Sequence, residues 1–247
     1  MFQILKAGVI PFAHGGQAWQ DATVFEAVAM GIGGNNYYKN CYVDLKETCL
    51  RSETTVKVFD QMRKLQGFTD EGSPGRDWNV ATGMVIEGKA GFQIMGDWAK
   101  GEFTAAGKVP GVDYYCAPTP SNNGYLYNVD SFIFYKTNDP EKQEGQKLLA
   151  KLMMGKNFQK VFNLYKGSIP ARLDVSMDEF DKCAKTSNSD IKTAGASGGL
   201  VPSFAHGMAQ GNTMKAALQD VITEHFNSDM SSVDAANALA DSVLDNM

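Results

Sequence analysis

Apolar residues recur every three or four positions along most of the chain, and they form short unbroken runs elsewhere. The first pattern is typical of helices and the second of buried strands. One helical pattern begins near residue 21. The others cover 58–66, 77–85, 99–106, 140–153, 157–165, 214–222 and 231–243. The strand-like runs are 90–95, 112–117 and 131–135, whereas 69–76 and 185–199 are polar, glycine-containing segments that we expect to be loops. This alternation predicts an α/β fold.

Two proline-containing segments are typical of crossings between domains. Ala117-Pro118-Thr119-Pro120-Ser121 is stiff and extended, and Gly167-Ser168-Ile169-Pro170-Ala171 interrupts a helical pattern in the same way. A chain that leaves a domain and returns to it through such segments builds two lobes with a hinge.

Composition narrows the possible functions. With 247 residues, the chain is long enough for one large domain or two small ones. A net charge of −5 and a pI near 5.2 argue against a nucleic-acid partner. No apolar run approaches the ~18 residues that span a bilayer, and the first residues lack the features of a signal peptide. The four cysteines form no CxxC pair, which leaves disulfides and free thiols equally open.

Aromatic and charged residues near predicted turns are the candidates for chemistry. In Lys89–Trp98 a short strand, a glycine turn and an aspartate precede Trp98, so its ring can face a cleft. A flat ring stacks on the C–H face of a sugar, and charged groups bind its hydroxyls. The other candidates are Asp77, Trp78, Asp97, Asp130, Lys166, His206 and His14.

Each candidate also has a structural interpretation that spacing alone leaves open. The tryptophans could be core residues, and Asp77 and Asp97 could cap helices. Asp130 could be a turn residue, and Lys166 could complement a helix dipole. The two histidines, His14 and His206, could be ordinary loop residues.

One motif invites a catalytic interpretation that we reject. Gly195-Ala196-Ser197-Gly198-Gly199 matches the G-x-S-x-G pattern of serine hydrolases. That pattern requires a buried strand before the serine and a helix after it, whereas here a polar stretch precedes Ser197 and Pro202 follows. The sequence has no Walker loop, dinucleotide fingerprint or metal triad.

Four segments carry a resemblance that extends over essentially the whole chain. They are Ile10-Pro11-Phe12-Ala13-His14-Gly15-Gly16-Gln17-Ala18-Trp19-Gln20, Arg76-Asp77-Trp78-Asn79, Gly91 to Lys100, and Tyr127-Asn128-Val129-Asp130-Ser131. In this order and spacing, the sequence resembles the periplasmic glucose-binding proteins of ABC importers, in the maltose-binding-protein-like group of sugar receptors.

The resemblance implies the two-lobed α/β fold of type II periplasmic binding proteins, here incomplete because the N-terminal part of the first lobe is missing. By this resemblance, residues 1–117 belong to the second lobe, 118–170 return to the first, and 171–247 complete the second. We expect the export signal to lie in the missing part.

The resemblance also implies site residues. Trp78 and Trp98 match the aromatic platforms of the family, and Asp130 matches a polar group on the sugar hydroxyls. Lys166 and His206 match by neighbourhood more than by motif. Some members carry a cysteine pair where Cys116 and Cys183 stand, which implies a disulfide, whereas Cys41 and Cys49 have no such counterpart.

These expectations describe a periplasmic receptor that is not an enzyme and needs no cofactor or metal. It would be a monomer that traps a monosaccharide, with glucose expected, and delivers it to an inner-membrane permease. Ligand contacts to both lobes would favour the closed form that the permease recognises. The alternatives are a receptor for another hexose or a disaccharide, and a carbohydrate hydrolase with paired carboxylates, although no such pair stands out.

Overall fold

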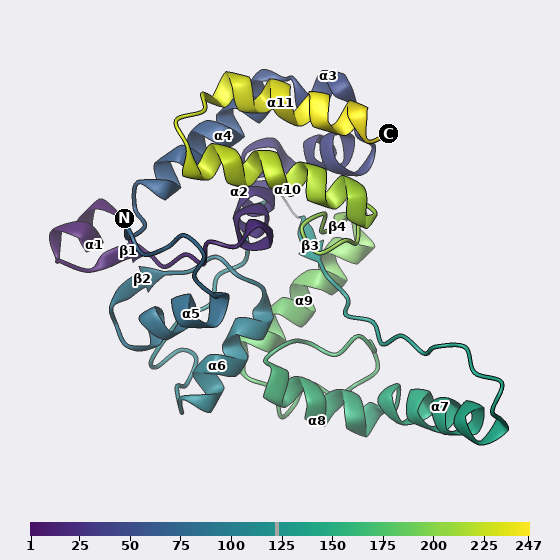
Figure 1. The fold of residues 1–247 in the computed structure, drawn as a ribbon. Helices are drawn as coiled ribbons and strands as arrows, with labels where there is room; N and C mark the ends of the chain where they lie inside the picture. The colour runs from purple at the N-terminus through teal and green to yellow at the C-terminus, as the bar shows by residue number, and fades with distance from the viewer. Residues whose placement is uncertain (122–123) are drawn as a thin grey trace. The chain divides into compact units, whose positions relative to one another are not determined.

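The computed structural model describes residues 1–121 and 124–247 (Figure 1). Its α-helices are α1 Phe2–Lys6, α2 Ala18–Tyr38, α3 Glu47–Leu50, α4 Glu53–Gln66, α5 Trp78–Ile86, α6 Lys100–Ala105, α7 Pro140–Met153, α8 Lys156–Lys166, α9 Lys182–Ala196, α10 Asn212–Asn227 and α11 Ser232–Asp245. A π-helical segment, η1, spans Lys39–Val43, and a 3-10 turn, η2, spans Asp97–Ala99. The strands are β1 Ile10–Phe12, β2 Ala90–Phe92, β3 Tyr125–Tyr127 and β4 Leu200–Pro202.

The strands form two small parallel sheets. In one, Ile10 of β1 is in register with Ala90 of β2, and in the other, Tyr125 of β3 is in register with Leu200 of β4. Within the described part of the chain, no helix combines the length and the apolar composition needed to cross a membrane.

The described chain forms two compact units, each assembled from segments far apart in sequence. Unit 1 comprises Met1–Gly96, Ala117–Asn128 and Asp190–Met247, and unit 2 comprises Asp97–Cys116 and Val129–Ser189. The chain passes from one unit to the other after Gly96, Cys116, Asn128 and Ser189, and the last of these points lies within α9. The lobe assignment given above stays a prediction.

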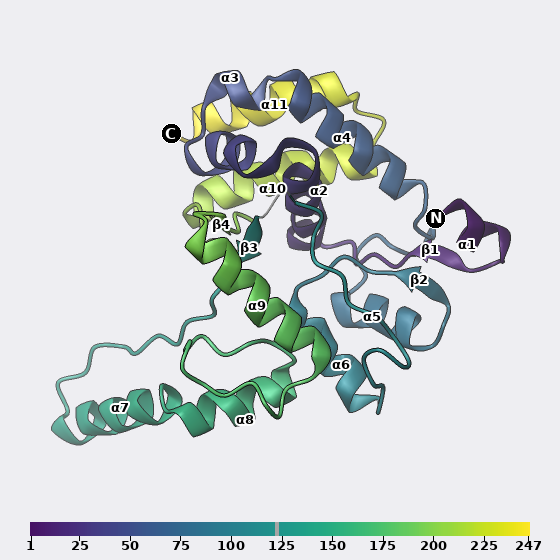
Figure 2. The same ribbon diagram turned by 180° about the vertical axis from the view of Figure 1, so that it is seen from behind.

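The core of unit 1 lies among four helices. α10 and α11 pack against each other and against α2 and α4, which both views of the ribbon show (Figures 1 and 2). Aromatic side chains fill the space between them: the ring of Phe25 lies 5.0 Å from that of Phe59 and 5.7 Å from that of Tyr42. Each such side chain, fully buried, contributes about 1.5–3 kcal/mol.

The end of α4 before Gly67 and the start of α11 after Ser231 lie where the sequence predicts them, whereas α4 begins at Glu53, before the predicted residue 58. The N–H of Thr55 donates to the Ser52 hydroxyl at the start of α4, and Gly67 follows its last residue. The N–H of Asp234 donates to the Ser231 hydroxyl at the start of α11. These caps satisfy backbone groups that the helix itself leaves unpaired.

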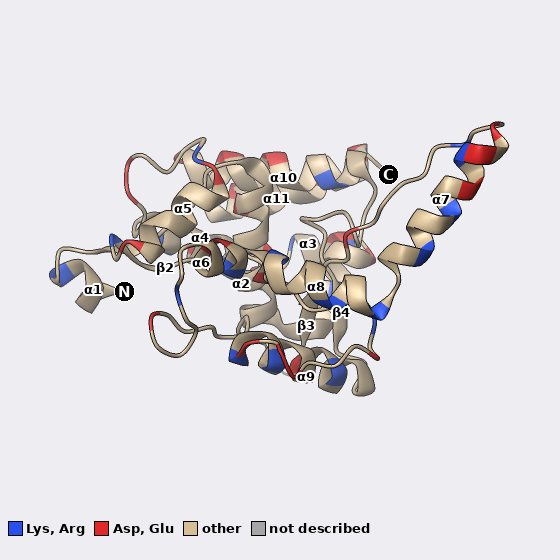
Figure 3. Ribbon diagram, turned by 90° about the horizontal axis from the view of Figure 1, so that it is seen from below, with Lys and Arg blue, Asp and Glu red and all other residues tan. Residues whose placement is uncertain are grey.

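In unit 2 the helix α7 has its leucines in solvent. Leu148 is 60% exposed, and Leu149 and Leu152 are exposed as well. Charged residues of both signs cover the rest of this helix (Figure 3), with Glu141 in its first turn and Lys151 in its last. That order complements the helix dipole, so the charges stabilise a helix whose apolar side has no partner among the described residues of unit 2.

Three predicted elements are wrong. Residues 131–135 form no strand, since no described strand pairs with them, and Ile133 is 78% exposed. Residues 112–117 contribute only an isolated bridge between Pro110 and Tyr114. The segment predicted as a loop, 185–199, is mostly the helix α9, which begins where the Asp181 carboxylate accepts the N–H of Ala184.

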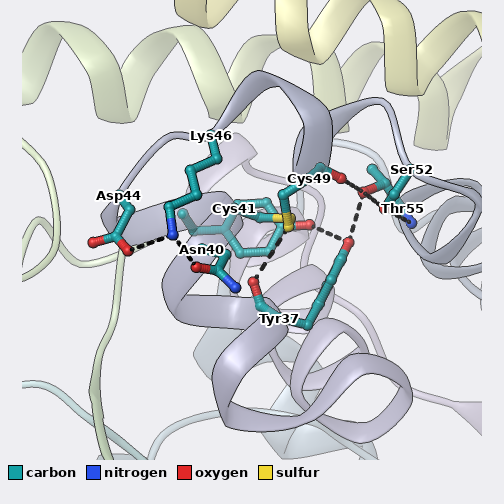
Figure 4. Close-up of a disulfide and its surroundings, with 9 residues drawn as sticks. Tyr37, Asn40, Cys41, Asp44, Lys46, Cys49, Ser52 and Thr55 are labelled. Atoms are coloured by element: carbon teal, nitrogen blue, oxygen red, sulfur yellow. Dashed lines mark hydrogen bonds and ion pairs between the residues drawn. A yellow bond between two sulfur atoms is a disulfide. The ribbon is translucent and has the colours of Figure 1, made fainter.

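A disulfide in unit 1 joins Cys41 of η1 to Cys49 of α3 (Figure 4). Beside it, the Tyr37 hydroxyl lies 2.8 Å from the Thr55 hydroxyl, and this contact joins the end of α2 to α4. Burial raises the pKa of Tyr37, which keeps its hydroxyl protonated for hydrogen bonding. The bridge therefore reinforces the turn between two core helices.

A second disulfide joins Cys116 to Cys183, the pair that the family resemblance implies. Both residues lie in unit 2, one in each of its two chain segments. Near it, the Lys100 ammonium lies 2.6 Å from the Asp181 carboxylate, and the ring of Phe103 stacks on that of Tyr114. The disulfide and the ion pair thus join the two segments of unit 2, whereas the aromatic contact lies within the first segment.

Candidate functional site

A close backbone contact in unit 1 brings the start of α2 to the loop that precedes α5. A Cβ atom on Gly16 would lie only 2.3 Å from the carbonyl oxygen of Ser73. Gly16 donates its N–H to the carbonyl of Arg76, and Gly75 donates to the carbonyl of Gly16. Only glycine permits two backbones to approach this closely, so this residue places the loop beside α2.

Two hydrogen bonds and a ring contact then connect Asp77, the residue before Trp78, with His206 through residues at the start of α2. Gln17 donates to the Asp77 carboxylate at 2.6 Å, and the indole N–H of Trp19 donates to Gln17 at 2.8 Å. The ring of Trp19 meets that of His206 edge-on, with centroids 5.9 Å apart. Trp78 itself is half-buried, so it is not an interior core residue.

Asp77 occupies the N-cap position of α5, as predicted, but its side chain makes no capping hydrogen bond. Its carboxylate accepts from Gln17 instead. The residue therefore links two elements, and the prediction of a side-chain cap is wrong.

In unit 2, Asp97 anchors the segment that follows α8. Its carboxylate accepts the N–H of Ile169 at 3.2 Å. Burial raises the pKa of Asp97, and hydrogen bonds from Ser168 and Ile169 partly oppose that rise. The neighbouring Trp98 is half-buried, and Asp97 is no simple helix cap because its partner comes from a distant segment.

The end of α8 lies directly against the start of α6. A Cβ on Gly101 would lie 2.8 Å from the carbonyl oxygen of Lys166, and Gly167 has a φ of +89°. A left-handed glycine after a helix is a common C-terminal cap. This packing brings the backbone at Lys166 and Gly167 against the segment Asp97–Gly101, which contains Trp98.

Lys166 and Asp130 form an ion pair, and the ammonium also lies 6.0 Å from the centre of the Phe162 ring. The carboxylate of Asp130 is largely exposed. A pair in contact with water contributes only about 0–1 kcal/mol to stability. Both groups can therefore exchange water for ligand hydroxyls at small cost.

The five predicted site residues thus divide between the units. Trp78 and His206 belong to unit 1, where Gln17 and Trp19 connect His206 with Asp77, the neighbour of Trp78 in sequence. Trp98, Asp130 and Lys166 belong to unit 2, where Asp130 and Lys166 form an ion pair. Each group combines an indole ring with charged or polar side chains, the chemistry that suits a neutral carbohydrate.

The structure gives less support to a metal site or to a serine hydrolase site. Within residues 1–121 and 124–247, no group of three or more His, Cys, Asp or Glu side chains could hold a metal ion. The Ser197 hydroxyl donates to the backbone carbonyls of Thr193 and Ala194 at the end of α9. This serine ends a helix, and it does not occupy the strand-to-helix turn that the hydrolase motif requires.

Comparison with known proteins gives the family. Residues 3–153 match the model of the bacterial extracellular solute-binding protein family. The chain belongs to this family. A "Probable sugar-binding periplasmic protein" of Brucella suis is 46% identical over 96% of this solute-binding protein and 56% of the relative. A protein of the same description from Rhizobium meliloti is 44% identical over 96% of this chain and 57% of its own.

A solved structure shares the fold of this solute-binding protein. The chain matches a "Chitin oligosaccharide binding protein" with a TM-score of 0.75 and 16% identity, over 99% of this chain and 62% of that one. The predicted fold class, the α/β fold of the solute-binding proteins, is therefore confirmed. The chain spans little more than half the length of the two sugar-binding relatives.

The sequence analysis missed the connecting residues Gln17 and Trp19 of this solute-binding protein. Both lie in the first segment of the family resemblance, immediately after two glycines and at the start of a helix. That position, next to a backbone contact that only glycine allows, is the signal that could have identified them.

Proposed function

We propose that the protein is the extracellular sugar receptor of an ABC importer and that it binds a monosaccharide, with glucose as the first candidate. One observation carries the proposal: in a chain 46% identical to a probable sugar-binding periplasmic protein, Lys166 and Asp130 form an ion pair in unit 2, and the backbone at Gly167 packs against the segment Asp97–Gly101, which contains Trp98. Trp98 would stack on the C–H face of the ring, and Lys166 and Asp130 would bind its hydroxyls.

The proposal includes the other expectations of the family. Trp78 and His206 are further candidate sugar-binding residues, and the receptor delivers its sugar to a membrane permease in the periplasm without a catalytic step. A sugar that contacts both lobes of a receptor stabilises the closed form, which gives the permease a way to distinguish loaded from empty receptor.

Sugar binding is tested best by calorimetry on the protein expressed from its complete reading frame. Trp98→Ala is expected to weaken glucose binding roughly tenfold or more, about 1.4 kcal/mol, because the stacking surface is lost. Tyr115→Ala, which removes an exposed aromatic ring of the same unit, should leave the affinity unchanged.

Titration with glucose, galactose and maltose distinguishes the possible ligands. Tighter binding of galactose or maltose than of glucose would replace the proposed ligand but keep the receptor. Release of reducing sugar from maltose would point to a hydrolase. If none of the three sugars bound, or if Trp98→Ala bound like the wild type, the proposed site would be wrong.

We also propose that residues 118–170 return to the first lobe, while 1–117 and 171–247 belong to the second. In this proposal, 118–170 pack against further residues of the first lobe, of the kind that the longer relatives contain. The exposed apolar side chains support this, among them Phe132, Ile133, Leu148 and Leu152. A hydrophobic dye should bind more strongly to this 247-residue chain than to the product of the complete reading frame. Equal dye binding by the two proteins, if they differ in length, would oppose the assignment.

A further inference from the structure

A buried carboxylate lies beneath His206 in unit 1. Glu26, in the middle of α2, is 3% exposed. A buried carboxylate needs donors to offset the loss of water, and Glu26 has three. The Ser203 hydroxyl donates to one oxygen at 2.7 Å, and the Tyr38 hydroxyl and the N–H of Ala205 donate to the other at 3.0 and 3.3 Å.

The Tyr38 donor remains protonated. Burial raises the pKa of Tyr38 well above its usual range, and the charge of Glu26 raises it further. With a donor on each of its two oxygens, Glu26 is a hydrogen-bond acceptor at both.

The hydrogen-bond inventory of Ser203 then fixes the hydrogen of the neighbouring histidine. A serine hydroxyl has one hydrogen and two lone pairs. Glu26 accepts the hydrogen, and the backbone N–H of His206 donates to the oxygen at 3.1 Å. The remaining neighbour of this oxygen is His206 Nδ1 at 2.9 Å. Since the hydroxyl has no second hydrogen to give, Nδ1 must donate.

The loop around His206 keeps this geometry. It follows β4, and the N–H of Met208 donates to the carbonyl of Ser203 at 2.8 Å. Gln219 of α10 binds the carbonyl of Ala205 at 3.1 Å, and the ring of Trp19 packs against the imidazole. Contacts from α2 and α10 thus hold the imidazole over the serine.

We propose that Glu26 is a positioning residue that, through Ser203, holds the ring hydrogen of His206 on Nδ1. In the neutral imidazole, Nε2 then has the lone pair and can accept a hydrogen bond. Because this nitrogen is buried in the structure, a ligand hydroxyl reaches it only when the groups around it move. This last step rests on the proposed function, whereas the position of the hydrogen does not.

Nitrogen NMR of the histidine rings tests the position of the hydrogen directly, at a pH where the rings are neutral. The protein has three histidines, and His206→Gln identifies the signals of interest. In the wild type we expect Nδ1 to carry the hydrogen. In Glu26→Gln the amide can donate to Ser203, whose hydroxyl is then free to donate to Nδ1, so the hydrogen should move to Nε2.

Two further variants keep this test decisive. Tyr38→Phe removes a hydrogen bond to the same carboxylate but leaves its charge, so it should destabilise the fold while Nδ1 keeps its hydrogen. If Glu26→Gln does not fold, Ser203→Ala removes the acceptor and should give a mixture of both tautomers. A hydrogen on Nε2 in the wild type, or an unchanged tautomer in the folded Glu26 and Ser203 variants, would overturn the proposal.

A double-mutant cycle tests the consequence for sugar binding. Glu26→Gln should lower the affinity roughly fivefold, and it should cause no further loss when His206 is already alanine. A purely structural role would produce the same loss in both backgrounds and would overturn the positioning role. If no sugar binds, the proposed function fails, while the NMR result still decides the tautomer.

Discussion

Replacement of Cys116 and Cys183 by serine is expected to lower the free energy of unfolding of unit 2 by about 4 kcal/mol. The two cysteines are 67 residues apart in sequence, and closing a loop of that length removes about this much chain entropy from the unfolded state. The effect should be close to the full amount because the disulfide joins the two separate segments of the unit, which otherwise depend on noncovalent contacts such as the Lys100–Asp181 ion pair.

The same substitution at the other disulfide is the matched comparison. Cys41 and Cys49 are only eight residues apart, so the expected loss is about 2.5 kcal/mol. Trp98 is the single tryptophan of unit 2, so its fluorescence in a background with Trp19→Phe and Trp78→Phe reports the unfolding of this unit in urea. A loss at the long loop that does not exceed the loss at the short one would contradict the entropic account.

Local chemistry explains which parts of the fold the sequence could predict. The end of α4 and the start of α11 depend on a glycine or a serine next to the helix, so the pattern alone identifies them. The run 131–135 has the same apolar character as a strand, but a strand exists only where another pairs with it. Strand pairing is non-local, and no residue in the run reveals whether a partner is present.

The helix α9 was missed for the opposite reason. Its sequence is polar and rich in small residues, with Gly195 near its end and Gly198 and Gly199 just beyond it, and that composition is typical of a loop. The helix is specified by a cap at Asp181 and by two buried alanines, Ala184 and Ala194. These signals are too weak to be identified without the packing.

The candidate site also contains residues that local sequence identifies and residues that only distant contacts reveal. Trp98 and Asp130 follow turns, and the turn residues identify such positions in the sequence. The roles of Gln17 and Glu26 come from contacts with residues 60 and 177 positions away. In sequence, Glu26 is one acidic residue in an apolar helical run, and only the fold reveals what its carboxylate meets.

The second large effect that we expect is a loss of stability in acid that depends on a single histidine. His225 of α10 is fully buried, and neither ring nitrogen has a hydrogen-bond partner among the described residues. Burial lowers the pKa of His225 to about 4, with a further contribution from the charge of Arg63. In the unfolded chain the same ring titrates near 6.5.

Between these two values the unfolded chain binds a proton that the folded protein does not, so stability falls as the pH falls. The loss begins below about pH 6.5 and reaches about 3 kcal/mol near pH 4, at roughly 1.4 kcal/mol for each unit of difference in pKa. His225→Leu removes the titrating ring. The free energy of unfolding of this variant should therefore decrease less than that of the wild type between pH 7 and pH 4, by nearly this amount.

Urea unfolding at a series of pH values measures this difference, because contributions from other groups cancel between the two proteins. Phe59→Leu is the control: it removes the ring that packs 4.8 Å from the imidazole but keeps the titrating group. That variant should lose stability at every pH and keep the acid dependence of the wild type. If His225→Leu kept the wild-type slope as well, the acid sensitivity would arise from other groups, and the buried imidazole would be protonated or solvated in the folded state.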